Sequence, residues 1–98
     1  MTLAKNALTT GSKTCGTSAV QLSAVGNLVL SQGVTVYADS NNPSTVYIGD
    51  STVTADGSDA STGMPLSPGD SIYIPIKHLD FLYIVSADDS NKVFFIGV

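Results

Sequence analysis

The clearest hydrophobic pattern lies in the middle of the chain. Apolar and polar residues alternate over residues 34–38, and the alternation resumes over residues 45–49. A period of two is typical of a β-strand that buries one face. The residues between these segments are polar: Pro43 fixes one backbone angle, and Asn41 and Asn42 tolerate unusual ones. The pattern predicts a strand, a turn and a second strand.

Three further segments have the pattern of strands. Alternation returns over residues 71–76, directly after residues 67–70, where Pro and Gly at the two central positions predict a type II turn. Pro75 cannot donate a ladder hydrogen bond, so we expect this strand at a sheet edge or at a bulge. Residues 81–86 predict a densely apolar strand, buried on both faces or at an interface. Residues 92–98 predict the closing strand.

Six to eight short strands at intervals of about ten residues predict an all-β fold. We expect a compact antiparallel β-sandwich or squat barrel, jelly-roll-like, because the apolar strand faces need a second sheet to cover them. Composition supports this prediction. Ser and Thr fill 23 of 98 positions, Gly fills nine, and Glu and Arg, which favour helices, are absent.

The chain length predicts one folded unit. We expect residues 1–18, which are small, polar and weakly patterned, to form an N-terminal arm or an early edge strand. Residues 19–98 should form a single sandwich domain. An arm of this kind could be ordered by a partner, and the domain is expected to fold without it.

The charge balance argues against two classes of partner. All eight acids are Asp and all four bases are Lys, which gives a net charge of −4. The lysines are scattered, so we expect no nucleic-acid partner. No apolar run approaches the ~20 residues of a membrane helix, and we expect no membrane partner. The N-terminus lacks the apolar core of a signal peptide, which predicts synthesis in the cytoplasm.

Candidate catalytic and metal-binding groups are few. A nucleophilic Cys15 would need His78, the only histidine, as its base, and a zinc site would need more ligands than this pair provides. The acidic segments 56–59 and 88–91 offer oxygen ligands for calcium, but Asp and Asn in turns commonly bond to their own backbone. We therefore expect no enzyme, no catalytic or metal residue and no cofactor.

The aromatic residues are the candidate interface residues. Three tyrosines fall on the face opposite the Val and Ile residues of their strands. Such a face suits a protein interface or stacked sugars, and ordinary cross-strand pairing would also explain it. The apolar C-terminal strands are expected to supply core and oligomer contacts. The full candidate set is Tyr37, Tyr47, Tyr73, Phe81, Tyr83, Phe94 and Phe95.

The order of several segments resembles small virion proteins of tailed bacteriophages, in particular head-decoration (cement) proteins. The resemblance covers residues 21–98. It rests on Gly33-Val34 opening an alternating strand, on Val46-Tyr47-Ile48-Gly49, on Pro65-Leu66, and on Pro68-Gly69-Asp70 before the strand 71–76. Tyr37, where similar proteins often carry a basic residue, and Pro43-Ser44, in place of a glycine-containing turn, depart from the pattern.

The resemblance implies a mechanical function. A cement protein binds where capsid subunits meet and stabilises the phage head through buried interface area. The implied partners are the major capsid protein and further copies of the chain, with a trimer favoured, and the implied location is the capsid surface of the virion. Residues 1–18 would act as a capsid clamp. A carbohydrate- or receptor-binding module of a fibre or head surface, using the tyrosines or the loop 55–63, is the alternative.

Overall fold

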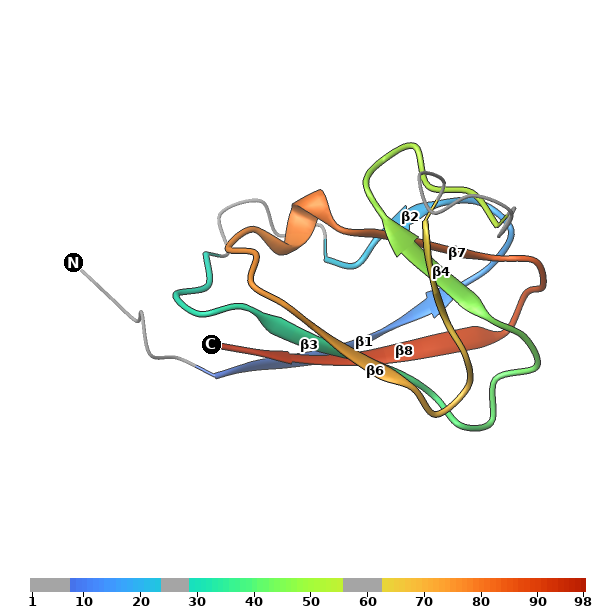
Figure 1. The fold of residues 1–98 in the computed structure, drawn as a ribbon, viewed down its shortest axis with the longest axis horizontal. Coiled ribbons are helices and arrows are strands. Elements are labelled where there is room, and N and C mark those ends of the chain that lie inside the picture. Colours follow the sequence, from blue (N-terminus) through green and yellow to red (C-terminus); the bar gives the residue numbers. More distant parts are fainter. Residues whose placement is uncertain (1–7, 24–28, 56–62) are drawn as a thin grey trace.

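The computed structural model describes residues 8–23, 29–55 and 63–98. It is all-β, with two antiparallel four-stranded sheets packed face to face, as Figure 1 shows. The predicted β-sandwich is confirmed. The two alternation segments that led to it form β3 (Val34–Ala38) and β4 (Val46–Gly49), one in each sheet.

The strand order is that of a jelly roll. Sheet A has the order β1-β8-β3-β6 and sheet B the order β2-β7-β4-β5. Successive strands lie in opposite sheets except for the β4–β5 hairpin, which gives two interlocked Greek keys. The remaining elements are β1 (Thr9–Cys15), β2 (Val20–Gln21), β5 (Met64–Leu66), β6 (Ser71–Ile74), the 3₁₀ helix η2 (Leu79–Phe81), β7 (Tyr83–Ser86) and β8 (Asn91–Gly97).

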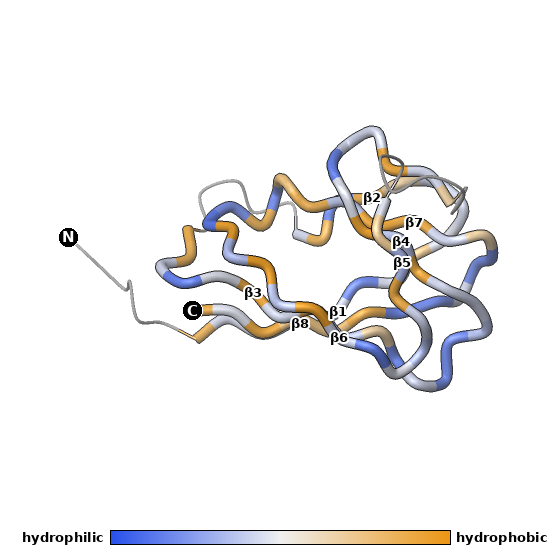
Figure 2. The backbone as a smooth tube through the Cα atoms, in the orientation of Figure 1, coloured by the Kyte–Doolittle hydropathy of each residue, from blue (hydrophilic) through white to orange (hydrophobic). Residues whose placement is uncertain are grey.

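The core lies between the inner faces of the two sheets. Alternate residues of β3 and β8, including Val34, Val36 and Val93, have no exposed surface. They belong to one cluster with Val46 and Ile84 of sheet B. Figure 2 shows hydrophobic residues concentrated along the strands and hydrophilic ones at the turns. The period of two therefore decides which side chains leave water.

Each edge strand has a feature that opposes pairing with another chain. Lys13 of β1 shares the inward register of the buried Cys15, and β5 contains Pro65. In sheet A, β6 is an edge strand that ends at Ile74, directly before Pro75, and this confirms the predicted edge position. β2 has only two residues. Inward charges, prolines and short edges all disfavour strand addition.

The turn before β6 has the predicted type II geometry. Gly69 has a φ of 89°, and the backbone N–H of Asp70 donates to the Ser67 carbonyl at 2.9 Å. Only a residue that tolerates positive φ fits this third position, and glycine does so without strain.

The turn between β3 and β4 depends on side chains rather than on unusual backbone angles. Neither Asn41 nor Asn42 has a positive φ, and Ser90 is the only described non-glycine residue that does. The Asn42 amide donates to the Lys92 carbonyl at 2.9 Å and accepts from the Lys92 N–H at 2.8 Å. It thereby substitutes for a strand backbone beside β8, so the backbone role expected for the asparagines is wrong.

Asn91 is the centre of a buried polar network at this end of the sandwich. Its side chain has no exposed surface. The two amide hydrogens are shared among three acceptors, the hydroxyl groups of Ser44 and Ser86 and the Asp88 carbonyl, each 3.0 Å from the nitrogen. The amide oxygen accepts from the Ser44 N–H at 3.2 Å. One side chain therefore joins the β3–β4 turn, β7 and β8.

The strand predicted over residues 81–86 is shorter in the structure. It begins only at Tyr83, because Phe81 ends η2, where its N–H bonds to the His78 carbonyl at 3.1 Å.

Of the predicted N-terminal segment, Thr9–Cys15 form edge strand β1, which pairs with β8 along its whole length and buries Cys15. Residues 1–7 lie outside the described residues. Deleting residues 1–18 would remove an edge strand and a core side chain.

The Asn91 network predicts a large loss of stability on truncation. Asn91→Ala leaves several shielded groups without partners, and we expect it to lower the free energy of unfolding by about 3 kcal/mol. Urea denaturation measures the change. Asn41→Ala, at an exposed position of the neighbouring turn, is the control, with an expected change within about 0.5 kcal/mol. Equal effects of the two changes would contradict the structural role of Asn91.

The buried thiol predicts a decrease in stability at alkaline pH. Burial raises the pKa of Cys15 above its ordinary value of 9.0, and a hydrogen bond with Ser86 partly opposes the rise. Because the folded state favours the neutral thiol, this contribution to stability is complete below pH 9.0 and is lost as the pH rises through the raised pKa. The unfolding free energy of the wild type minus that of Cys15→Ala should therefore fall as the pH rises above 9.0. A difference that stays constant would refute this assignment.

Candidate functional site

The outer face of sheet A carries a group of exposed aromatic and aliphatic side chains. We name this group the aromatic face: Tyr37, Tyr73, Phe94 and Ile96, with exposed fractions of 36%, 57%, 41% and 46%. The strand register places them side by side, with Tyr37 opposite Phe94 and Thr35 between Ile96 and Tyr73. Three adjacent strands therefore contribute to one surface.

Contacts within the aromatic face hold its rings in place. The ring centroids of Tyr37 and Phe94 lie 6.2 Å apart, and the Lys92 Nζ lies 5.7 Å from the Phe94 centroid. These distances fit an aromatic pair and a cation–π contact. Lys92 is the only charged residue among the described outward positions of sheet A.

Tyr73 is fixed by its polar end. Its hydroxyl donates to the Gln32 carbonyl at 2.8 Å, so the ring lies over the chain entering β3. A Cβ at Gly33 would lie 2.8 Å from this hydroxyl and 2.6 Å from the Ile74 carbonyl oxygen, and the φ of Gly33 is 148°. Glycine at this position therefore permits the close approach of β6 and its tyrosine.

The arrangement can bind a partner but holds no reacting pair. A contiguous exposed apolar surface with aromatic rings and few charges is typical of a protein interface. The Tyr37 hydroxyl has no hydrogen-bond partner among the described residues and is available to a partner. No described group of three or more His, Cys, Asp or Glu side chains could hold a metal ion.

The structure separates the predicted interface residues into different surfaces. Tyr47 and Tyr83 are half-buried and belong to sheet B. Tyr47 therefore does not share a surface with Tyr37 and Tyr73, which belong to sheet A. Phe81 is 57% exposed on η2, on the sheet B side of the molecule. Phe95 points inward and is part of the core, with 9% of its surface exposed.

The other candidate groups do not come together. Cys15 pairs with Asn91 at one end of sheet A, whereas His78 bridges to Val29 near the opposite end and places its ring 5.0 Å from that of Phe81. In the acidic segment 88–91, the side chain of Asn91 is taken up by the buried network. The acidic segment 56–59 and most of the loop 55–63 lie outside the described residues.

Ile96 is a surface residue that the sequence pattern does not single out. Residues 92–98 predict an apolar closing strand, whereas β8 (Asn91–Gly97) alternates strictly between buried and exposed positions. The polar residues Asn91 and Lys92 at its start obscured the period, because the buried one of the two is the asparagine. Assigning Phe94 and Ile96 to one face of the strand and Phe95 to the other would have identified Ile96 as a surface residue.

Comparisons with protein-family models, with curated proteins and with solved structures each find no match. Within the described part of the chain, no helix has the length and hydrophobicity to cross a membrane. The interpretation of the aromatic face therefore depends on its own geometry and chemistry.

The two exposed tyrosines of the aromatic face predict different responses to loss of the hydroxyl. Tyr73→Phe removes the bond to Gln32 and should lower the unfolding free energy by about 1 kcal/mol. Tyr37→Phe removes a hydroxyl that has no described partner, and we expect a change near zero. Chemical denaturation of both variants measures the difference. A larger loss in Tyr37→Phe would mean that the two hydroxyl groups have been assigned the wrong roles.

Proposed function

We propose that this chain is a structural virion protein that decorates and stabilises a bacteriophage capsid, with no catalytic role. The observation that carries the proposal is the aromatic face, an ordered apolar surface with one charged side chain at its border. A surface of this kind is suited to permanent burial against another protein. The resemblance of residues 21–98 to cement proteins supplies the partner class.

The sheet edges favour docking through a face. Lys13, Pro65 and Pro75 oppose strand addition at β1, β5 and β6, so an added strand from a partner has no suitable template. The outer face of sheet A is left as a broad surface for contact. In this proposal the major capsid protein contacts the aromatic face at capsomer junctions.

The fold agrees with this function by analogy. Jelly rolls recur in viral capsid proteins and in lectins, and a fold shared with such proteins supports a structural or binding role without proving either. We further propose that the chain assembles as a homotrimer on the capsid surface of the virion after synthesis in the host cytoplasm. Oligomeric contacts would use exposed apolar residues outside the capsid contact.

A charge placed within the aromatic face tests the proposal. Phe94→Asp should lower affinity for heads assembled from the partner major capsid protein by about 30-fold or more, because it buries an unpaired carboxylate in the interface. Cosedimentation with assembled heads measures binding, and circular dichroism confirms that the variant is folded.

The matched control is Met64→Asp, a similarly exposed apolar residue on β5 of sheet B, with 50% of its surface exposed. It should bind heads as the wild type does. Wild-type protein that does not cosediment with heads, or that is missing from purified virions by mass spectrometry, would overturn the proposed function. Equal losses in the two variants would exclude the aromatic face as the contact.

A further inference from the structure

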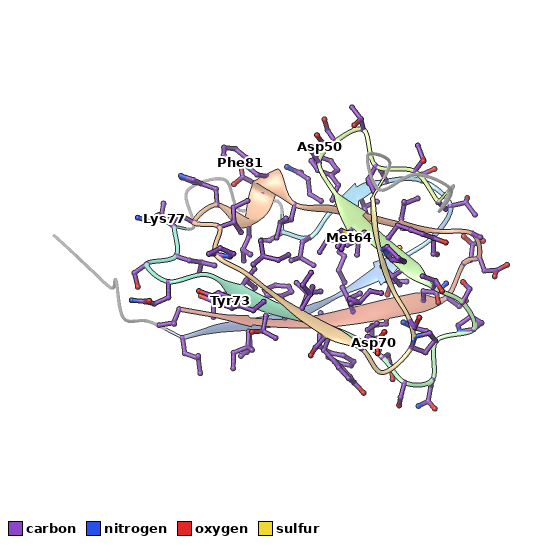
Figure 3. All side chains as sticks on the ribbon, viewed as in Figure 1. Asp50, Met64, Asp70, Tyr73, Lys77 and Phe81 are labelled. Atoms are coloured by element: carbon purple, nitrogen blue, oxygen red, sulfur yellow. The ribbon has the colours of Figure 1, made fainter. Side chains whose placement is uncertain are left out.

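A hollow of about 520 Å³ lies on the opposite side of the sandwich from the aromatic face. Its described lining residues come from β2, the turn after β4, η2 and β7: Gln21, Asp50, Ser51, Asp80, Phe81 and Tyr83. Its size is within the roughly 300–1,000 Å³ of small-molecule sites. Figure 3 shows Asp50 and Phe81 on this side of the molecule, away from sheet A.

Local packing fixes the strands and the turn that line the hollow. Gln21 and Tyr83 are paired across β2 and β7, and Gly49 is opposite Tyr83 on β4. Val53 packs against Gly49, where a Cβ would lie 3.2 Å from its side chain, and the Val53 N–H donates to the Asp50 carbonyl at 3.0 Å. The buried Val53 thereby holds the turn that presents Asp50 and Ser51.

One wall of the hollow is aromatic. Phe81 exposes 57% of its surface, and its ring lies 5.0 Å from the His78 ring, which supports it from one side. Tyr83 is half-buried beside it in the outward row of β7. A supported aromatic ring exposed in a hollow offers a flat apolar surface for a ligand to stack on.

The polar groups of the hollow are oriented and supply mainly acceptors. The Gln21 amide nitrogen donates to the Asp80 carbonyl at 3.0 Å, which leaves its side-chain oxygen without a described partner. The Asp50 Oδ1 accepts from the Thr52 N–H at 2.9 Å and from the Thr52 hydroxyl at 2.6 Å. These bonds lower the pKa of Asp50 and hold it as a carboxylate whose second oxygen is available.

Asp80 adds a carboxylate oxygen that accepts no hydrogen bond from the described residues. Its Oδ1 is shielded from solvent and has no hydrogen-bond partner among the described residues. A carboxylate oxygen in this state is destabilising, because it has lost water without gaining a bond. Because Asp80 also lines the hollow, a ligand hydroxyl that reaches this oxygen would supply the missing donor.

These features define the ligand class. Two carboxylates and no Lys or Arg among the described lining residues disfavour phosphates, nucleotides and other anions. An excess of acceptors calls for a neutral molecule rich in hydroxyl donors, and the aromatic wall calls for one with an apolar ring face. We propose that this hollow binds a neutral saccharide through stacking on Phe81 and hydroxyl bonds to Asp50, Asp80 and Gln21.

The test is titration of the folded protein with lactose, maltose, cellobiose and chitobiose, followed by two-dimensional amide NMR. We expect at least one disaccharide to shift resonances of residues 21, 50–52 and 79–83 in a saturable manner. Phe81→Ala should weaken this binding about tenfold or more by removing the stacking surface. Asp50→Asn should weaken it to a similar extent, since bonds to a charged acceptor are stronger than bonds to a neutral one.

Met64→Ala is the control, because it removes an exposed apolar side chain of the same sheet outside the hollow. It should bind as the wild type does. Saturable shifts that persist in both hollow variants, or that map to the aromatic face, would overturn the proposal, as would no shift with any of the four sugars. Saturation by calcium or by free lysine in place of sugars would also overturn it. The proposal does not depend on capsid binding, which has its own variants and assay.

Discussion

The structure depends on the need to bury one face of β3 and β8 at the centre of sheet A. These strands alternate between fully buried and outward residues, and Val34, Val36, Ala38 and Val93 have no exposed surface. Such a face needs a second packed layer to cover it, and in this chain the second layer is sheet B. Sheet B supplies the cover with Val46, Ile84 and Leu66. The same alternation places Tyr37, Phe94 and Ile96 outside, so the core and the candidate interface are consequences of one pattern.

The architecture follows from the sequence wherever a local rule agrees with the tertiary requirement. Residues 34–38 alternate, and Gly69 follows Pro68 in a turn whose type those two residues specify, so strand and turn were both predicted. Pro75 likewise placed β6 at an edge, because a proline has the same effect in any sheet. The pairing of the strands into two sheets joins residues far apart in the chain, such as Thr9 and Gly97, and no local pattern specifies it.

The candidate site was only partly predictable, for a physical reason. The period of two tells which strand residues share a side, but it does not tell which strands share a sheet. Tyr37 and Tyr73 therefore meet on one surface, and Tyr47, which has the same local pattern, lies on the other sheet. Asn42 and Asn91 were interpreted as turn residues. Only the fold reveals that the Asn42 amide bonds to Lys92, 50 positions away, and the Asn91 amide to Ser44, 47 positions away. The hollow beside Phe81 depends on a 3₁₀ turn where the sequence indicates a strand.

A jelly roll has two outer faces that point in opposite directions, and this chain equips them differently. The face of sheet A is apolar, with Lys92 at its border and no described outward carboxylate. The hollow on the side of sheet B has Asp50 and Asp80 beside an exposed ring. Apolar contact favours an interface that stays buried, whereas oriented acceptors in an open hollow favour a ligand that exchanges with solvent. Because the aromatic face and the hollow lie on opposite sides of the sandwich, a partner on one of them leaves the other accessible. A molecule bound through sheet A would therefore display the hollow outward, where a soluble or surface-attached sugar could reach it.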